Sequence, residues 1–182
     1  MLYHRGATMQ NGRRLLVVAG VFVALLTLSW LARRPGGGGG GASGDGFPEA
    51  PLVSVDGQKV SLKECPTAKC LTAYVAPWCG VCRASTALIV DLKGYLRERG
   101  VAMRVVVGRD RAGAMTDYAR ELGPDTLLDP SGLVDVGGGV PQFIVSDASG
   151  RILLRQPGVP RIVQPPVPVE ALQEMADFLR LP

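Results

Sequence analysis

The sequence predicts an α/β domain with a central mixed sheet flanked by helices, preceded by a single transmembrane helix. Three observations support this fold class. Residues 71–76 form a short apolar run that ends at Pro77, and helical spacing follows. Residues 101–107 are apolar apart from Arg104, which is typical of a central strand covered on both faces. Residues 15–32 carry no charge over 18 positions, which is long enough to span a bilayer.

The N-terminal part divides into three segments of different composition: a basic tail (1–14), the apolar run (15–32) and a glycine-rich linker (33–46). Five arginines flank the run, three before it and two after it: Arg5, Arg13, Arg14, Arg33 and Arg34. This excess predicts a cytoplasmic tail, a single-pass anchor in the cell membrane and a domain at 47–182 on the periplasmic, extracytoplasmic side. A cleaved signal peptide and twin-arginine export are the alternatives.

The charge distribution argues against a nucleic-acid partner. The formal net charge is +4, but five basic residues and only one acidic residue, Asp45, precede residue 47. The remaining 15 basic residues are matched by 15 acidic ones, so the domain is formally neutral. The one histidine, His4, lies in the tail, which excludes histidine catalysis and histidine metal ligands in the domain.

The first half of the domain predicts a hairpin, a strand and a long helix. Asp56-Gly57 is a turn signal between two short apolar segments, and it predicts a β-hairpin over residues 52–62. Residues 71–76 are the strand that leads into the cysteine motif. Apolar residues at helical spacing then predict a helix over 80–99, bent at Gly94 and ended by Gly100.

The second half alternates strands and helices in the same way. Residues 101–107 are a strand, and a helix over 112–122 ends at Gly123-Pro124. The remaining predicted elements are a short strand (126–128), a hairpin (142–146 with 151–154), an irregular proline-rich segment (156–168) and a C-terminal helix (169–181).

The cysteine motif carries the chemistry. Trp78 is followed by Cys79-Gly80-Val81-Cys82 at the start of the predicted helix. Free N–H groups and the helix dipole stabilise an anion there, and the thiolate is the form of cysteine that attacks disulfides. We therefore expect Cys79 to be the nucleophile and the more buried Cys82 to resolve the mixed disulfide. A plain structural disulfide or half of a zinc site are the alternatives.

This motif resembles the active site of the thioredoxin superfamily. Residues 50–52 and 56–62 also resemble the start of the membrane-anchored TlpA/ResA-type thioredoxins, and the likeness extends over nearly all of 47–182. The resemblance implies a thioredoxin fold with an extra N-terminal β-hairpin. It also implies that Val140-Pro141 is a cis-proline dipeptide facing the cysteines, with Trp78, Val140 and Pro141 binding substrate backbone.

Two positions depart from these families. Thioredoxins carry a buried acid where this chain has Ala73, and ResA-type proteins carry a glutamate where it has Ser85. The dipeptide Gly80-Val81 also lacks the proline of the reducing thioredoxins. The sequence therefore leaves the direction of the reaction open.

A second cysteine pair, Cys65 and Cys70, precedes the strand that leads to the motif. In an oxidising compartment we expect it to be a structural disulfide. Two alternatives are a relay that exchanges electrons with Cys79 and Cys82, and a four-cysteine zinc site that uses all of them.

Together these features predict an extracytoplasmic thiol–disulfide oxidoreductase without organic cofactor or metal. Resemblance to the TlpA/ResA type favours reduction of exported cysteine-containing proteins, such as apocytochrome c, with electrons from a membrane dithiol carrier. The alternatives are a disulfide-forming oxidase, a peroxiredoxin-like peroxidase and a redox-inactive or metallochaperone binding module. A peroxiredoxin usually has a threonine or serine shortly before its reactive cysteine, whereas this chain has Ala76-Pro77-Trp78 before Cys79. A metallochaperone needs a distal histidine, and the predicted domain contains none.

Overall fold

The computed structural model describes residues 46–182. The predicted tail, the predicted membrane span at 15–32 and all but the last residue of the predicted linker lie outside the described residues. Within 46–182, none of the helices combines the length and hydrophobicity that a bilayer crossing requires.

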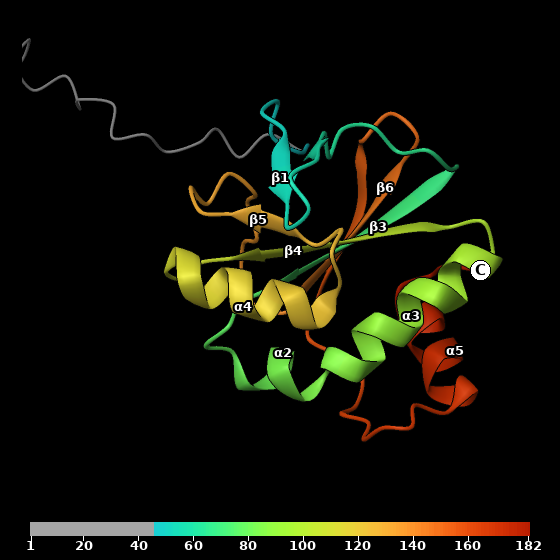
Figure 1. The fold of residues 1–182 in the computed structure, drawn as a ribbon. Coiled ribbons are helices and arrows are strands. Elements are labelled where there is room, and N and C mark those ends of the chain that lie inside the picture. Colours follow the sequence, from blue (N-terminus) through green and yellow to red (C-terminus); the bar gives the residue numbers. More distant parts are fainter. Residues whose placement is uncertain (1–45) are drawn as a thin grey trace, which may run out of the picture. The chain divides into compact units, whose positions relative to one another are not determined.

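The described residues form one seven-stranded sheet in the order β2-β1-β5-β4-β3-β6-β7 (Figure 1). The strands are β1 (Leu52–Ser54), β2 (Lys59–Val60), β3 (Lys69–Val75), β4 (Ala102–Gly108), β5 (Leu127–Asp129), β6 (Gln142–Asp147) and β7 (Ile152–Pro157). The pairs β3–β4 and β4–β5 are parallel, whereas the other neighbours are antiparallel. The predicted mixed sheet is confirmed.

Strand β3 lies at the centre of the architecture because both of its edges are paired and both of its faces are covered. It hydrogen-bonds to β4 on one side and to β6 on the other. Its residues alternate between two cores, so that Leu71, Ala73 and Val75 face one core and Tyr74 faces the other. The chain therefore leaves β3 at a fixed point, and the cysteine motif follows directly.

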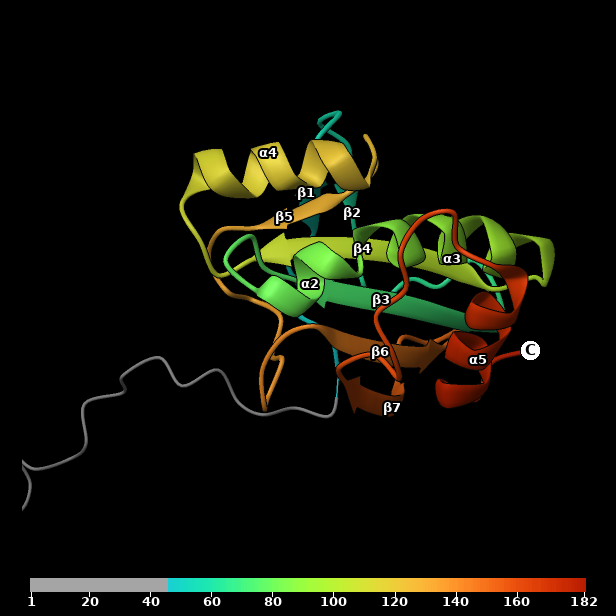
Figure 2. The same ribbon diagram turned by 90° about the horizontal axis from the view of Figure 1, so that it is seen from below.

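Within residues 46–182, four helices accompany the sheet: α2 (Gly80–Ala84), α3 (Thr86–Glu98), α4 (Ala112–Leu122) and α5 (Val169–Phe178). Figures 1 and 2 show them gathered on one side of the sheet, and buried residues of α2, α3, α4 and α5 share one core with Leu71 and Val75. The other core lies under the N-terminal segment and the loop after β5, with Phe47, Leu62 and Val136 as members.

The single predicted helix over 80–99 is wrong, because the chain breaks at Ser85. Ser85 has φ −101° and ψ 6°, and its amide donates to the carbonyls of both Val81 and Cys82. This shared hydrogen bond tightens the last turn of α2, and α3 starts afresh at Thr86. Gly94 lies inside α3, which runs without a break from Thr86 to Glu98.

The predicted N-terminal hairpin is confirmed, and it extends the central sheet. Leu52 pairs with Val60 across the hairpin, and Val53 of β1 pairs with Leu128 of β5. The short strand predicted near residues 126–128 is therefore the element that joins the hairpin to β4.

Candidate active site

The turn between β3 and α2 places Cys79 at the N-cap of α2. The amide of Cys79 donates to the Ala76 carbonyl at 3.1 Å, which closes the turn. The Cys79 sulfur accepts a hydrogen bond of 3.1 Å from the Cys82 amide, one of the free N–H groups of the first helical turn. The same contact would stabilise a thiolate at this position, because a charged sulfur is a stronger acceptor.

Cys79 and Cys82 form a disulfide, with their Cα atoms 5.2 Å apart. Cys79 is 6% exposed, whereas Cys82 is fully buried. Cys82 is thus the more buried of the two, as predicted. A thiol or disulfide arriving from outside reaches the Cys79 sulfur first.

Trp78 borders Cys79 with an exposed side chain, 62% accessible to solvent. Its indole Nε1 donates to the Arg109 carbonyl at 2.8 Å. Arg109 adopts a left-handed backbone conformation (φ 60°) just after β4, and this turns its carbonyl toward the indole. Val81, on the first turn of α2, is also exposed. Exposed apolar side chains therefore both precede and follow Cys79 in the sequence.

The structure brings Val140 to the cysteines. Its carbonyl oxygen lies 3.5 Å from the Cys79 sulfur, although the two residues are 61 positions apart in the sequence. The Val140–Pro141 peptide bond is cis, the isomer that the resemblance implies. Pro141 is buried, and β6 begins at the next residue, Gln142. Trp78, Cys79, Cys82 and the dipeptide therefore belong to one site.

The two positions that depart from the related families lie beneath this site. Ala73 is fully buried in the same core as Cys82. Ser85 is also fully buried, and its hydroxyl has no hydrogen-bond partner among the described residues. Neither position supplies a carboxylate that could accept a proton from Cys82, and the full burial of Cys82 is unfavourable for a charged thiolate.

Tyr118 is a site residue that sequence reasoning missed. This buried residue of α4 donates its hydroxyl hydrogen to the Cys82 carbonyl at 2.8 Å, and its oxygen lies 3.1 Å from the Thr86 hydroxyl. Burial raises the pKa of the Tyr118 phenol, so it remains a donor through the physiological range. The available signal was its place on the apolar face of α4, together with Met115 and Leu122.

Charged side chains of α2 and α4 surround Tyr118. The Arg83 guanidinium lies 4.5 Å from the centre of the Tyr118 ring and pairs with Glu121 at 3.1 Å. These contacts link α2 to α4 across the outside of the site.

A buried carboxylate lies on the other face of the sheet. Asp129, at the end of β5, accepts hydrogen bonds from the Tyr74 hydroxyl at 3.1 Å and from the amides of Leu133 and Val134. Burial, with Asp129 as the next cause, raises the pKa of the Tyr74 phenol far above its usual value. Tyr74 belongs to the core opposite the cysteines, so we assign this cluster to the structure of the loop after β5.

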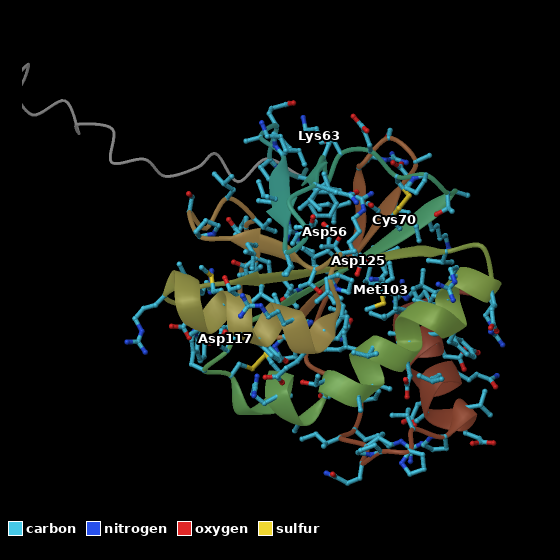
Figure 3. The ribbon with its side chains drawn as sticks, viewed as in Figure 1. Asp56, Lys63, Cys70, Met103, Asp117 and Asp125 are labelled. Atoms are coloured by element: carbon cyan, nitrogen blue, oxygen red, sulfur yellow. A yellow bond between two sulfur atoms is a disulfide. The ribbon has the colours of Figure 1, made fainter. Side chains whose placement is uncertain are left out.

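The second cysteine pair is also a disulfide, with Cα atoms 5.7 Å apart. Cys70 lies near the start of β3, whereas Cys79 follows its end. Five residues of β3, Leu71 to Val75, follow Cys70, and at about 3.3 Å each they place Cys70 roughly 17 Å from the end of the strand where the motif begins. Figure 3 shows Cys70 at the end of β3 away from α2. A direct electron relay and a shared four-cysteine zinc site are both incompatible with this separation.

Comparison with known families settles the relationship. The sequence matches the Redoxin family model over residues 42–159, which is more than half of the chain. The chain belongs to the Redoxin family. With the cysteine pair at the head of α2, this Redoxin is a thioredoxin-like oxidoreductase, and the predicted TlpA/ResA-type resemblance is consistent with it. No curated protein sequence matches the chain.

Solved structures share the fold of this Redoxin at low sequence identity. A secreted disulfide oxidoreductase of Mycobacterium tuberculosis, homologous to DsbE of E. coli, has a TM-score of 0.51 and 17% identity, over 70% of this chain and 94% of that one. StoA of Bacillus subtilis has a TM-score of 0.54 and 16% identity, over 69% and 94%. An exposed lipoprotein thioredoxin of Streptococcus pneumoniae has a TM-score of 0.51 and 22% identity, over 68% and 97%. These likenesses support the thioredoxin fold.

Proposed function

We propose that this Redoxin is a membrane-attached, extracytoplasmic thiol–disulfide oxidoreductase that reduces disulfides in exported cysteine-containing proteins. One observation carries the proposal. The cysteine pair begins α2, and the Cys79 sulfur accepts a hydrogen bond from the Cys82 amide. This sulfur can be reached from outside and lies 3.5 Å from the Val140 carbonyl oxygen. This arrangement has a nucleophile, a resolving thiol and a backbone surface for a substrate in one place.

The reaction is dithiol exchange. In the reduced protein, the Cys79 thiolate attacks one sulfur of a substrate disulfide, and the other substrate sulfur leaves as a thiolate that takes up a proton. The Cys82 thiol loses its proton and attacks Cys79 in the mixed disulfide, which releases the second substrate thiolate. The substrate gains two electrons and the Cys79–Cys82 disulfide forms. A membrane dithiol carrier then returns two electrons to the pair.

Substrate recognition is proposed to use backbone and apolar contacts. An extended peptide that pairs with the chain at Val140 would lie beside the Cys79 sulfur, since the Val140 carbonyl already faces it. The exposed side chains of Trp78 and Val81 would contact apolar residues of an unfolded or partly folded substrate. Such contacts depend little on the amino-acid sequence of the substrate. They therefore suit a protein that acts on several exported partners, and apocytochrome c is one candidate.

Two features support the proposed location. Residues 15–32 have the length and composition of a membrane anchor. Two of the similar structures are a secreted oxidoreductase and an exposed lipoprotein thioredoxin. We therefore propose that this domain lies on the outer side of a membrane.

The reverse direction is the second candidate function, because Ala73 and Ser85 stand where the related families carry acidic residues. A proton acceptor beneath Cys82 would help the resolving step of a reductase, and the apolar core offers none at these positions. An oxidase would use the same sulfurs with the steps reversed.

Trapping of partners tests the function. Full-length protein with Cys82→Ser should accumulate mixed disulfides through Cys79, and mass spectrometry should identify exported cysteine proteins in them. The Cys79→Ser variant is the control and should trap none. The proposal fails if both variants trap the same proteins, or if the trapped proteins are cytoplasmic. A Cys79/Cys82 reduction potential near about −270 mV would indicate a reductase, and one near about −120 mV would indicate an oxidase.

A further inference from the structure

A pocket borders the second disulfide, far from the site described above. It has a volume of about 490 Å³, within the range of small-molecule sites, and lies between β2, the start of β4 and the segment that carries Cys65. Its lining includes Cys65 and three charged residues, Lys59, Glu64 and Arg104. Met103 and Asp125, which also line it, are labelled in Figure 3.

The two sulfurs of this disulfide have different surroundings. Cys65 is half-buried and borders the pocket, whereas Cys70 is fully buried. The Nη2 atom of Arg104 lies 3.5 Å from the Cys70 sulfur. An incoming nucleophile therefore reaches Cys65, and the sulfur that would leave, Cys70, already has a cation beside it.

Arg104 is held in place independently of the cysteines. Its Nη1 donates to the Ser61 carbonyl at 2.8 Å, and its Nη2 donates to the Glu64 carbonyl. Burial lowers the pKa of the guanidinium and the nearby Glu64 carboxylate raises it, but arginine keeps its charge in proteins. A fixed cation lowers the energy of a thiolate, and a stabilised thiolate is a faster leaving group.

We propose that Cys65–Cys70 is a second thiol–disulfide exchange centre, at which a low-molecular-weight peptide thiol bound in the pocket attacks Cys65 and Cys70 leaves as a thiolate beside Arg104. The bond between the two protein sulfurs breaks as the bond between the small thiol and Cys65 forms. A second molecule of the small thiol then attacks the sulfur of the first one in that mixed disulfide and releases the Cys65 thiolate. The pair gains two electrons, and two small thiols become one disulfide.

The pocket chemistry favours a small zwitterionic thiol as the reactant. Lys59 and Arg104 supply positive charge, and Glu64 and Asp125 supply negative charge, around one concave site. A peptide thiol that carries both carboxylate and ammonium groups complements this mixture, whereas a neutral thiol gains nothing from it. Five residues of β3, roughly 17 Å of strand, lie between Cys70 and the end of β3 that leads to the motif, so this exchange is independent of Cys79 and Cys82.

The test uses the full-length protein with Cys79→Ser and Cys82→Ser, so that one disulfide remains. Glutathione, a zwitterionic peptide thiol, is the probe, and dithiothreitol is the neutral comparison. Mass spectrometry after acid quenching should show a glutathione adduct on Cys65 and a free thiol at Cys70. Adding Arg104→Gln should slow reduction by either reagent roughly tenfold or more, because a charge-assisted contact to the leaving thiolate is lost.

Two further variants separate chemistry from folding. Arg97→Gln removes an exposed arginine of α3 and should leave both rates unchanged. Lys59→Glu alters an exposed pocket residue and should slow glutathione several-fold while leaving dithiothreitol unchanged. The proposal is overturned if glutathione leaves the disulfide intact in the folded protein, if the adduct forms on Cys70, or if Lys59→Glu slows both reagents equally.

Discussion

Tyr118 is the residue through which α4 reaches the active site. Replacing Tyr118 with Phe removes the hydroxyl that donates to the Cys82 carbonyl, while the ring stays in the core. A net hydrogen bond of this kind contributes about 1 kcal/mol, so we expect the free energy of unfolding to fall by about that amount. Urea unfolding of the oxidised protein measures it.

Tyr95 provides a matched control for this substitution. Its ring stacks against Arg99, with 3.5 Å from the guanidinium carbon to the ring centre, and Phe preserves that contact. No hydrogen bond of the Tyr95 hydroxyl is found within residues 46–182, so Tyr95→Phe should change stability little. Equal losses in the two variants would contradict the role given to Tyr118.

Single residues also show where sequence prediction of the site succeeds. Cys79 and Cys82 follow from a local motif, and Val140-Pro141 follows from resemblance to a family. Tyr118 and the Arg109 carbonyl do not, because their contacts depend on how α4 and the loop after β4 pack against α2. A backbone carbonyl also has no signature in the sequence, since every residue carries one.

The turn between β6 and β7 is an element whose stability should depend on pH. Asp147 accepts hydrogen bonds from the amide and hydroxyl of Ser149 and from the amide and Nε of Arg151. Chiefly the Ser149 hydroxyl, followed by Arg151, lowers the pKa of the Asp147 carboxyl from 3.8 to about 2. The carboxylate form is favoured in the folded state, so its stabilisation is present above about pH 4 and is lost as the pH falls toward 2.

Asp147→Asn tests this dependence. Asn cannot ionise, so the variant should be less stable at neutral pH and should lose less stability between pH 5 and pH 2, an approximate window set by the shifted pKa. Urea unfolding at both pH values measures the difference. Asp91→Asn, at an exposed position of α3, is the control and should retain the full acid loss. An acid loss in Asp147→Asn as steep as in the unaltered protein would refute the assignment.

Helices and strands were predicted well where the apolar pattern and helix-ending residues such as Gly and Pro agree, and less well where no such residue marks the boundary. Helix α4 has the predicted bounds because Gly123 and Pro124 end it. The break at Ser85 has no such marker, because apolar spacing continues across it from Val81 to Leu88. The break is marked by the Ser85 amide, which donates to two carbonyls at once, and a one-dimensional pattern does not contain such a backbone detail.

At the scale of the whole domain, β3 keeps the two disulfides apart. One lies at each end of the strand, and the strand is paired on both edges and buried on both faces. The mixed sheet and the hairpin were predictable, because central strands are continuous apolar runs and Asp-Gly turns are local signals. The environment of Cys65 and Cys70 was not, since Arg104 reaches them from a neighbouring strand.

Removal of the second disulfide tests this separation. Cys65→Ala with Cys70→Ala opens a short loop, and the loop-entropy model gives a loss of about 2 kcal/mol in the free energy of unfolding. The reduction potential of Cys79 and Cys82 should stay the same, because no contact in the described domain joins the two pairs directly. Urea unfolding and equilibration against dithiothreitol measure the two quantities. A potential shifted by more than about 30 mV, equivalent to about 1.4 kcal/mol, would mean that β3 transmits the state of one end to the other.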